Sequence, residues 1–366
     1  MILDRYFARL FLQSFLVIGA IFLSLILLVD LIEQVRRFEG VGLSFGQVFR
    51  LTLLNAPATM SEILPLLMIL ATIVLFVSLA RSSELVATRA IGRSGIRALV
   101  APVLVALIIG VLAVAMLNPI VAATSERYQR LSDTYRNGGA SALSFSGEGL
   151  WLRQGSPTGG QSVIHATGFG GEGITLYNVT ILTFAKDGGP VRQIFSDSAE
   201  LATDTWVLRN AKVWPLVAGI NPEANAVLHE TLDIPTTLTQ DRIRDTLSNQ
   251  DTISIYDLPE VIAALREAGF NTKQHEVWLQ VQLARPMFLV SMVLVGAAFT
   301  MRHVRFGGTG VAVLTAVLLG FALYFVRNFA QILGENGQIP IILAAWAPPV
   351  AALMLTFGLL LYSEDG

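Results

Sequence analysis

The sequence predicts a membrane protein with six transmembrane helices, three on each side of an inserted, β-rich domain outside the membrane. Hydrophobic residues make up 53% of the 366 residues and charged residues only 14%, against about 25% charged residues in soluble domains. Six apolar runs are long enough to cross a bilayer, which takes about 20 residues in a helix. One long polar stretch separates the third run from the fourth.

The six runs are nearly free of charge, so each is expected to form a helix in lipid. They cover residues 11–29, 63–80, 98–118, 278–300, 307–326 and 339–362. Glu62 stands at the outer end of the second run. Arg285 lies close to one boundary of the fourth, where a long side chain can reach the interface. Pro119 is expected to end the third helix.

The arginines in the short loops predict the orientation, because cytoplasmic loops carry an excess of Lys and Arg. One side of the membrane would hold eight arginines and the other three. The richer side holds Arg5, Arg9, Arg81, Arg89, Arg93, Arg97, Arg302 and Arg305, and the poorer side holds Arg36, Arg37 and Arg50. Both termini are therefore expected in the cytoplasm, and residues 119–277 outside it.

The polar stretch alternates apolar and polar residues between about residues 141 and 239, with recurring Gly, Pro, Asn and Asp turns. Short strands are expected at 149–153, 162–165, 174–184, 191–195 and 205–213. This spacing of strands favours a sandwich or jelly roll. Residues 254–259 then open an amphipathic helix that leads the chain back to the fourth span.

The expected organisation has four parts. They are residues 1–140 with three spans and a cytoplasmic coupling helix at about 81–97, residues 141–253 as a periplasmic β-jellyroll-like domain, residues 254–277 as an amphipathic helix and return linker, and residues 278–366 with the last three spans.

The sequence contains no constellation typical of an enzyme. Its four histidines are scattered, it has no cysteine, and no HExxH motif or close His/Asp/Glu cluster suggests a metal site. No GxxxxGK[ST] loop is present to bind nucleotide phosphates, so the chain is not expected to hydrolyse ATP itself. A net charge of −2 argues against a basic surface for nucleic acid. We expect neither a catalytic residue nor a cofactor.

The loop at residues 79–97 is the most informative segment. A short helix lying along the membrane face would begin at Ser82 or Ser83, carry Glu84 in its first turn, and end at Gly92. Arginines in such a loop are explained by topology alone. The Ser-Glu-Leu and Arg-Ala-x-Gly sequences are more specific than topology requires, and they favour docking of a cytoplasmic partner.

Spacing further predicts which residues of this helix would face that partner. Glu84, Thr88 and Ile91 are four and three residues apart, so they are expected to share one face.

The same loop resembles the coupling segment of the lipopolysaccharide export permeases. The matching residues are Ser83, Glu84, Leu85, Arg89, Ala90 and Gly92. That family has two subunit types, and three further segments are similar to the G-type: residues 3–6 (Leu-Asp-Arg-Tyr), 149–153 (Gly-Leu-Trp-Leu-Arg) and 254–258 (Ser-Ile-Tyr-Asp-Leu). The motifs are short, but their order and spacing cover the whole chain.

The resemblance implies a multi-pass permease subunit of an ABC transporter in the bacterial inner membrane. Its implied partners are a sister permease of the F-type, a dimer of a cytoplasmic ATPase, a bitopic membrane anchor, a periplasmic bridge protein and lipopolysaccharide. The paired permeases would extract lipopolysaccharide and pass it to the bridge for export to the outer membrane. The coupling segment from Ser83 to Gly92 would fit a groove on the ATPase.

Two alternatives remain open. A lipoprotein-releasing permease follows the same broad design, but such proteins usually place one span before the external domain and three after it. An envelope scaffold would use the β domain to hold a partner, although it would have no use for a coupling helix.

Lipopolysaccharide carries phosphates above several acyl chains, so its site needs cations at the outer boundary and an apolar cavity below. The candidate phosphate ligands are Arg36 and Arg37 after the first span, and Arg127, Arg130 and Arg136 after the third. The candidate cavity residues are Phe321, Tyr324 and Phe325 on the fifth span. Each arginine could equally be a solvated helix end, and packing against lipid is the more common explanation for such aromatic residues.

One acid departs from this pattern. Asp30 stands at the end of the first span, where a negative charge would repel phosphate. A partner such as Arg327, at the outer end of the fifth span, would neutralise it.

Overall fold

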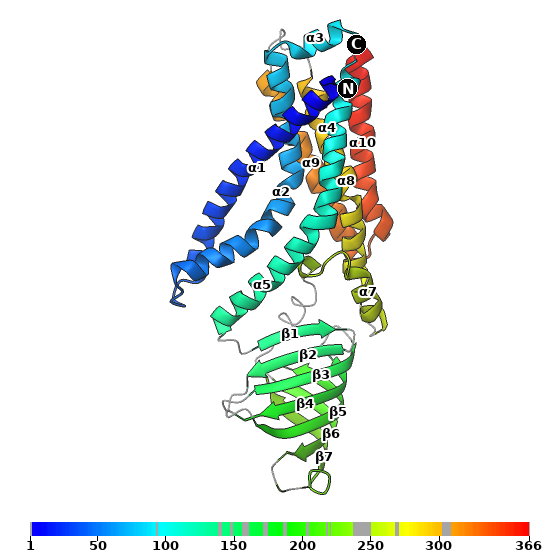
Figure 1. Cartoon of the computed structure of the whole chain (residues 1–366). Helices are drawn as coiled ribbons and strands as arrows, with labels where there is room; N and C mark the ends of the chain where they lie inside the picture. The colour runs from blue at the N-terminus through cyan, green and yellow to red at the C-terminus, as the bar shows by residue number, and fades with distance from the viewer. Residues whose placement is uncertain are drawn as a thin grey trace.

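The computed structural model describes residues 2–92, 94–137, 141–146, 149–155, 161–170, 175–185, 189–202, 205–216, 219, 221–236, 250–267, 271–301 and 309–365. Within these residues, six helices are long and apolar enough to cross a membrane, and one seven-stranded antiparallel sheet lies between the third and the fourth (Figure 1). The predicted fold class is confirmed. Arg93, Arg302 and Arg305, which contributed to the predicted orientation, lie outside the described residues.

The helices extend beyond the apolar runs that predicted them, because a helix satisfies its own backbone hydrogen bonds whether its ends lie in lipid or in water. Their bounds are α1 Ile2–Arg37, α2 Phe45–Arg81, α4 Gly95–Leu112, α5 Asn118–Asn137, α8 Lys273–Thr300, α9 Thr309–Glu335 and α10 Ile341–Asp365. α4 and α5 form one span, joined by a π-helical turn at Ala113–Leu117. α2 begins with a capping box between Ser44 and Gln47.

Pro119 does not end the third span, contrary to the prediction. Proline has no N–H to give to the carbonyl four residues earlier, which here belongs to Ala115. The hydroxyl of Tyr256 donates to that carbonyl instead, at 3.0 Å. The side-chain oxygen of Asn118 accepts the N–H of Ile255 at 2.8 Å. The segment after the sheet therefore stabilises the π-turn, and the helix continues through the proline.

α8 is the most covered span and α1 the least. Of the most apolar window of each, 78% of residues are buried for α8, against 6% for α1 and 11% for α9. Close helix contacts rely on small residues: a Cβ on Gly110 of α4 would lie 2.6 Å from the Pro286 Cα of α8, and one on Gly296 of α8 would lie 2.8 Å from Thr72 of α2. Much of the apolar surface of α1 and α9 is left uncovered.

The described strands pair only with their neighbours in the sequence, so the sheet is an up-and-down series from β1 to β7 without crossover between two sheets. The strands are β1 Ser141–Ser146, β2 Gly149–Gly155, β3 Gln161–Gly170, β4 Thr175–Phe184, β5 Pro190–Ala202, β6 Thr205–Pro215 and β7 Val227–Pro235. One row of paired residues crosses its core: Leu152, Ile164, Ile181, Ile194 and Val213. The sheet curves around this apolar row (Figure 1).

Two short elements connect these parts. A 3-10 turn, η2 (Gln250–Thr252), and a helix, α7 (Leu258–Glu267), lead from the sheet to α8. The remaining helix, α3 (Glu84–Ala90), lies at the opposite end of the bundle from the sheet, together with both chain termini (Figure 1).

Candidate functional site

The α3 helix is attached to the end of the bundle by its own apolar residues. Leu85 is buried in the same hydrophobic core as α2 and α4. The turn before α3 holds Ser83 at φ +60°, a conformation that is uncommon for residues other than glycine. Gly92, just after the helix, has φ +86°, which glycine adopts without strain. The turn before and the turn after α3 therefore fix its direction.

The expectation that Glu84, Thr88 and Ile91 share one face is wrong. Thr88 is 4% exposed and its hydroxyl donates to the Glu84 carbonyl at 2.7 Å, whereas Ile91 lies past the helix end and is 75% exposed. The spacing of Leu85 and Thr88, three residues apart, marks the buried face. Glu84 is half-buried beside the Tyr6 hydroxyl of α1.

The exposed surface of this end is thus partly apolar. Val86 and Ile91 are both exposed, and Ala90 lies between them in the sequence. The Arg89 side chain lies outside the described residues.

At the other end of the bundle, the arginines predicted to bind phosphate lie on α1 and α5. We call Arg36, Arg37, Arg127 and Arg130 the arginine rim; all four are exposed. Arg37 donates to the hydroxyl of Tyr128 at 3.0 Å, which connects the end of α1 to α5. Arg130 pairs with Glu126 at 3.5 Å. The Arg136 side chain lies outside the described residues.

Asp30 does not pair with Arg327. Its Oδ1 accepts the amide of Asn55 from α2 at 2.8 Å, and the amide of Gln34 at 3.4 Å. Its buried Oδ2 has no hydrogen-bond partner among the described residues. Asp30 therefore holds α1 against α2, while Arg327 lies over the ring of Phe288, 5.2 Å from its centre.

The three aromatic residues of α9 separate into two groups. Phe321 and Phe325 are exposed on the outer surface of the helix, but Tyr324 is half-buried and lines an internal cavity.

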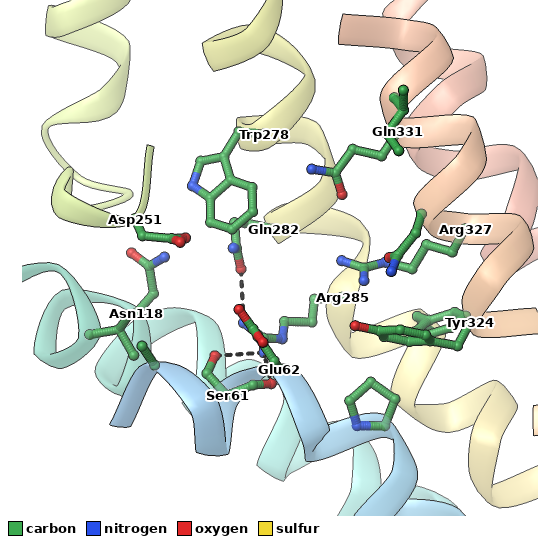
Figure 2. Close-up of a pocket in the computed structure, with 16 residues that line it drawn as sticks. Ser61, Glu62, Asn118, Asp251, Trp278, Gln282, Arg285, Tyr324, Arg327 and Gln331 are labelled. Atoms are coloured by element: carbon green, nitrogen blue, oxygen red, sulfur yellow. Dashed lines mark hydrogen bonds between the residues drawn. The ribbon is translucent and has the colours of Figure 1, made fainter. Parts of the chain in front are cut away.

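This cavity has a volume of about 330 Å³ and lies between α2, α5, η2, α8 and α9 (Figure 2). Four charged residues line it: Glu62, Asp251, Arg285 and Arg327. Uncharged polar residues accompany them, namely Ser61, Asn118, Trp278, Gln282, Tyr324, Asn328 and Gln331. So many polar groups inside a bundle of membrane spans indicate a functional site.

The expectation that Arg285 reaches the interface is wrong, because its side chain lies inside the bundle. It is 8% exposed. It donates to the Gln282 side chain at 3.1 Å, to the Ser61 hydroxyl at 2.7 Å and to the Ser61 carbonyl (Figure 2). These three acceptors hold the buried guanidinium in place. The position of Gln282 one helical turn before Arg285 is the signal that could have revealed this.

The four charges share the cavity without forming an ion pair with one another in the described part of the chain. Burial raises the pKa of the Asp251 carboxyl, and the positive charge of Arg285 partly lowers it again. Asp251 comes from η2, so the segment that returns from the sheet supplies one wall of the cavity.

Six spans, a large inserted sheet and a polar cavity inside the bundle define a polytopic membrane protein of the permease class. The family described as "Lipopolysaccharide export system permease LptF/LptG" matches residues 5–362 of the chain. The chain therefore belongs to this family of transport permeases.

Two relatives match along nearly their full length. The chain is similar to "Lipopolysaccharide export system permease protein LptG" of Haemophilus influenzae, with 24% identity over 384 residues, 99% of each chain. It is also similar to the protein of the same name from Escherichia coli strain K12, with 21% identity over 98% of each chain. Both relatives bear the name of the G-type, which is the type that the sequence motifs favoured.

Proposed function

We propose that the chain is the permease subunit of an ABC transporter that extracts lipopolysaccharide from the inner membrane and passes it to a periplasmic bridge. The observation that carries this proposal is the family match over residues 5–362, supported by full-length similarity to two proteins named for lipopolysaccharide export. The sequence has no nucleotide-binding loop, so ATP would be hydrolysed by a separate cytoplasmic dimer.

In this proposal the α3 end of the bundle faces the cytoplasm and the sheet faces the periplasm. Arginines support this orientation, because Arg5, Arg9, Arg81 and Arg97 all lie near the α3 end. Both termini would then be cytoplasmic.

The ATPase would dock on α3 and the residues around it, from Ser83 to Gly92. Leu85 attaches the helix to the bundle, so a force applied to α3 would reach α2 and α4. Val86 and Ile91 offer exposed apolar contacts, Ala90 allows close approach, and Glu84 and Arg89 add charge.

The sister permease, of the F-type, would cover α1 and α9. These are the spans with the smallest buried fraction, and exposed apolar side chains run along both. A second permease placed there would leave a chamber between the two subunits.

Lipopolysaccharide would enter this chamber with its phosphates on the arginine rim. Guanidinium groups bind phosphate through strong, often bidentate hydrogen bonds. Arg136 would extend the rim along α5. Phe321 and Phe325 of α9 would contact the acyl chains. Tyr324 would contribute from inside the bundle, where it lines the cavity.

The sheet would form the outlet. Among the described strands, the terminal ones, β1 and β7, each pair with one neighbour. A strand of a bridge protein or of the bitopic anchor can therefore add to either edge. A continuous β groove would then lead the substrate away from the membrane.

A photocrosslinker tests the substrate and its path. Placed at Ile32, an exposed residue of α1 close to the rim, it should capture lipopolysaccharide in membranes that contain the complete transporter. Placed at Met354, a still more exposed residue of α10, it should capture bilayer lipid. Equal capture of lipopolysaccharide at the two positions would contradict the proposed path.

A charge reversal tests docking. Glu84→Arg should reduce recovery of the ATPase with the purified permeases, or separate ATP hydrolysis from export, without changing the fold. Glu200→Arg, an exposed acid of the sheet, is the matched control. A Glu84→Arg complex that assembles and exports normally would exclude docking through this residue.

A further inference from the structure

The proposed export path does not involve the internal cavity. The arginine rim lies on the exposed ends of α1 and α5, whereas the cavity lies inside one subunit, between α2, α5, η2, α8 and α9. Charged groups that line a cavity inside a membrane cost free energy unless an opposite charge neutralises them. The arrangement of its charges indicates what the cavity would bind.

One end of the cavity is cationic. Figure 2 shows Arg327 pointing into the cavity from α9, near Tyr324 and Gln331, with Arg285 next to it. Arg285 already donates to Ser61 and Gln282, so it acts mainly as a fixed positive charge. Arg327 stacks on Phe288, and no hydrogen bond or ion pair of its guanidinium is found within the described residues. Its donors are available to an anion.

The other end is anionic. Asp251 of η2 lies on the side of the cavity opposite Arg327, with Asn118 and Trp278 beside it, and Glu62 lies between the two ends (Figure 2). A carboxylate next to an indole ring is suited to an ammonium group, which binds by charge and by cation–π attraction.

This arrangement disfavours simpler occupants. An anion alone would meet Glu62 and Asp251, and a cation alone would meet Arg285 and Arg327. The four side chains do not neutralise one another by direct pairing in the part of the chain that is described. A ligand that carries a positive and a negative group a short distance apart satisfies both ends.

Size and access fit a lipid head group. The volume of about 330 Å³ equals about eleven water molecules at about 30 Å³ each, enough for a phosphate joined to an amine. Ile332, which lines the cavity, is 52% exposed on the surface of α9. The cavity is therefore within reach of the bilayer, in the half of the bundle nearer the sheet.

We propose that this cavity binds a zwitterionic phosphoethanolamine head group, with its phosphate on Arg327 and Arg285 and its amine on Asp251 and Glu62. Two sources carry this chemistry: a bilayer phospholipid, or a lipid A modified with phosphoethanolamine. The inference goes beyond the proposed function and does not depend on it, because it concerns a separate site inside one subunit.

Native mass spectrometry of the detergent-purified complex tests the proposal with lipids of identical acyl chains. Phosphatidylethanolamine carries both charges, phosphatidylglycerol only the phosphate, and a trimethylammonium diacyl lipid only the cation. Phosphatidylethanolamine should bind about tenfold more tightly than either, which equals about 1.4 kcal/mol. Equal retention of phosphatidylglycerol would overturn the proposal in favour of a simple anion site.

Substitutions at the cationic end and at the anionic end of the cavity test which charge of the lipid each end binds. Arg327→Gln should weaken phosphatidylethanolamine about tenfold, and Asp251→Asn should weaken it while strengthening phosphatidylglycerol. The exposed pair Arg209 and Glu200, 3.9 Å apart on the sheet, supplies the controls Arg209→Gln and Glu200→Gln. If the first two variants fail to assemble, Arg327→Lys and Asp251→Glu keep the charges and should retain the preference. Binding that is the same in cavity and control variants would show that the charges only balance one another.

A competition arm distinguishes the sources. Phospholipid and phosphoethanolamine-modified lipid A are offered together, and the species retained by the unmodified chain but lost in Arg327→Gln is the ligand. If neither depends on Arg327, the proposal is wrong.

Discussion

Two groups of arginines occupy the half of the bundle nearer the sheet, and they differ in burial and in the groups that surround them. The arginine rim of α1 and α5 is exposed, and of its four members only Arg37 and Arg130 make a polar contact that the structure records. Arg285 is almost completely buried and is held by three acceptors, and Arg327 lies beside it in a cavity.

Burial and hydrogen-bond partners together separate arginines that stabilise the fold from arginines that are free to bind a substrate. A solvated guanidinium adds little to stability, below about 1 kcal/mol, so a rim arginine is free to exchange water for phosphate. The buried Arg285 guanidinium is held by acceptors within the fold, so its removal is expected to destabilise the protein before it reports on a ligand.

The largest expected effect is at the buried group. Arg285→Met should destabilise the protein by about 3 kcal/mol, because it leaves Glu62 and Asp251 with less compensating charge in the bundle. Thermal unfolding of the purified complex measures this. Arg209→Met on the exposed surface of the sheet should change stability by less than about 0.5 kcal/mol. Similar midpoints for the two variants would mean that burial does not distinguish the two kinds of arginine.

Asp30 lies between these extremes, since it is partly buried and binds neutral amides. Asp30→Ala should cost about 1–2 kcal/mol, because the Asn55 and Gln34 amides lose their acceptor. Asp30→Asn keeps one acceptor and should cost less. Accessibility of a cysteine placed at Ile32 would report whether α1 separates from α2. An unchanged accessibility in Asp30→Ala would exclude Asp30 as the contact between them.

Tyr128 should have a smaller effect that concerns the rim directly. Tyr128→Phe removes the acceptor of Arg37 and the partner of Gln34, at about 1 kcal/mol. Arg37 would then be free, so binding of a phosphate-bearing lipid should be preserved or slightly stronger while the unfolding midpoint falls. A loss of lipid binding in Tyr128→Phe would show instead that Arg37 must be positioned by Tyr128.

The smallest effect is expected on the surface of the sheet. Hydrogen bonds from Lys212 at 2.5 Å and Trp214 at 2.6 Å lower the pKa of Glu223. A lowered pKa stabilises the turn at Glu223 above the ordinary pKa of glutamate, and that stability is lost as the pH falls through the lowered value. Glu223→Gln should remove this dependence, as measured by hydrogen exchange of residues 221–227 at each pH. Identical pH profiles for the two proteins would contradict it.

The sequence predicted the parts of this molecule that depend on composition and period. Apolar runs located all six spans, and alternation located the sheet, because both patterns follow directly from burial. The continuation of the third span through Pro119 could not be predicted, since it requires Tyr256, more than 130 residues later, to replace a missing N–H.

The candidate sites were predictable from the sequence only where they depend on local features. The α3 segment and the rim arginines are local features: short motifs indicated the first, and the position of the arginines after the first and third spans indicated the second. The cavity combines side chains from five separate elements, so no window of sequence contains it. Arg285 and Asp30 were misassigned for this reason: the acceptors of Arg285 on α2 and the amide donor of Asp30 on α2 come from a distant part of the chain.

The most direct test of the account is ATP-driven release of lipopolysaccharide from proteoliposomes that contain this chain, its sister permease and the ATPase. The double variant Arg36→Glu, Arg37→Glu should lose most of this release and the stimulation of ATPase activity by lipopolysaccharide. Basal ATPase activity should stay unchanged, and the unfolding midpoint should fall no further than in Tyr128→Phe, because Arg37 loses its hydrogen bond to Tyr128. Arg209→Glu should release lipopolysaccharide normally. If the double variant and Arg209→Glu release it at the same rate, the rim does not hold the substrate and the central claim is wrong.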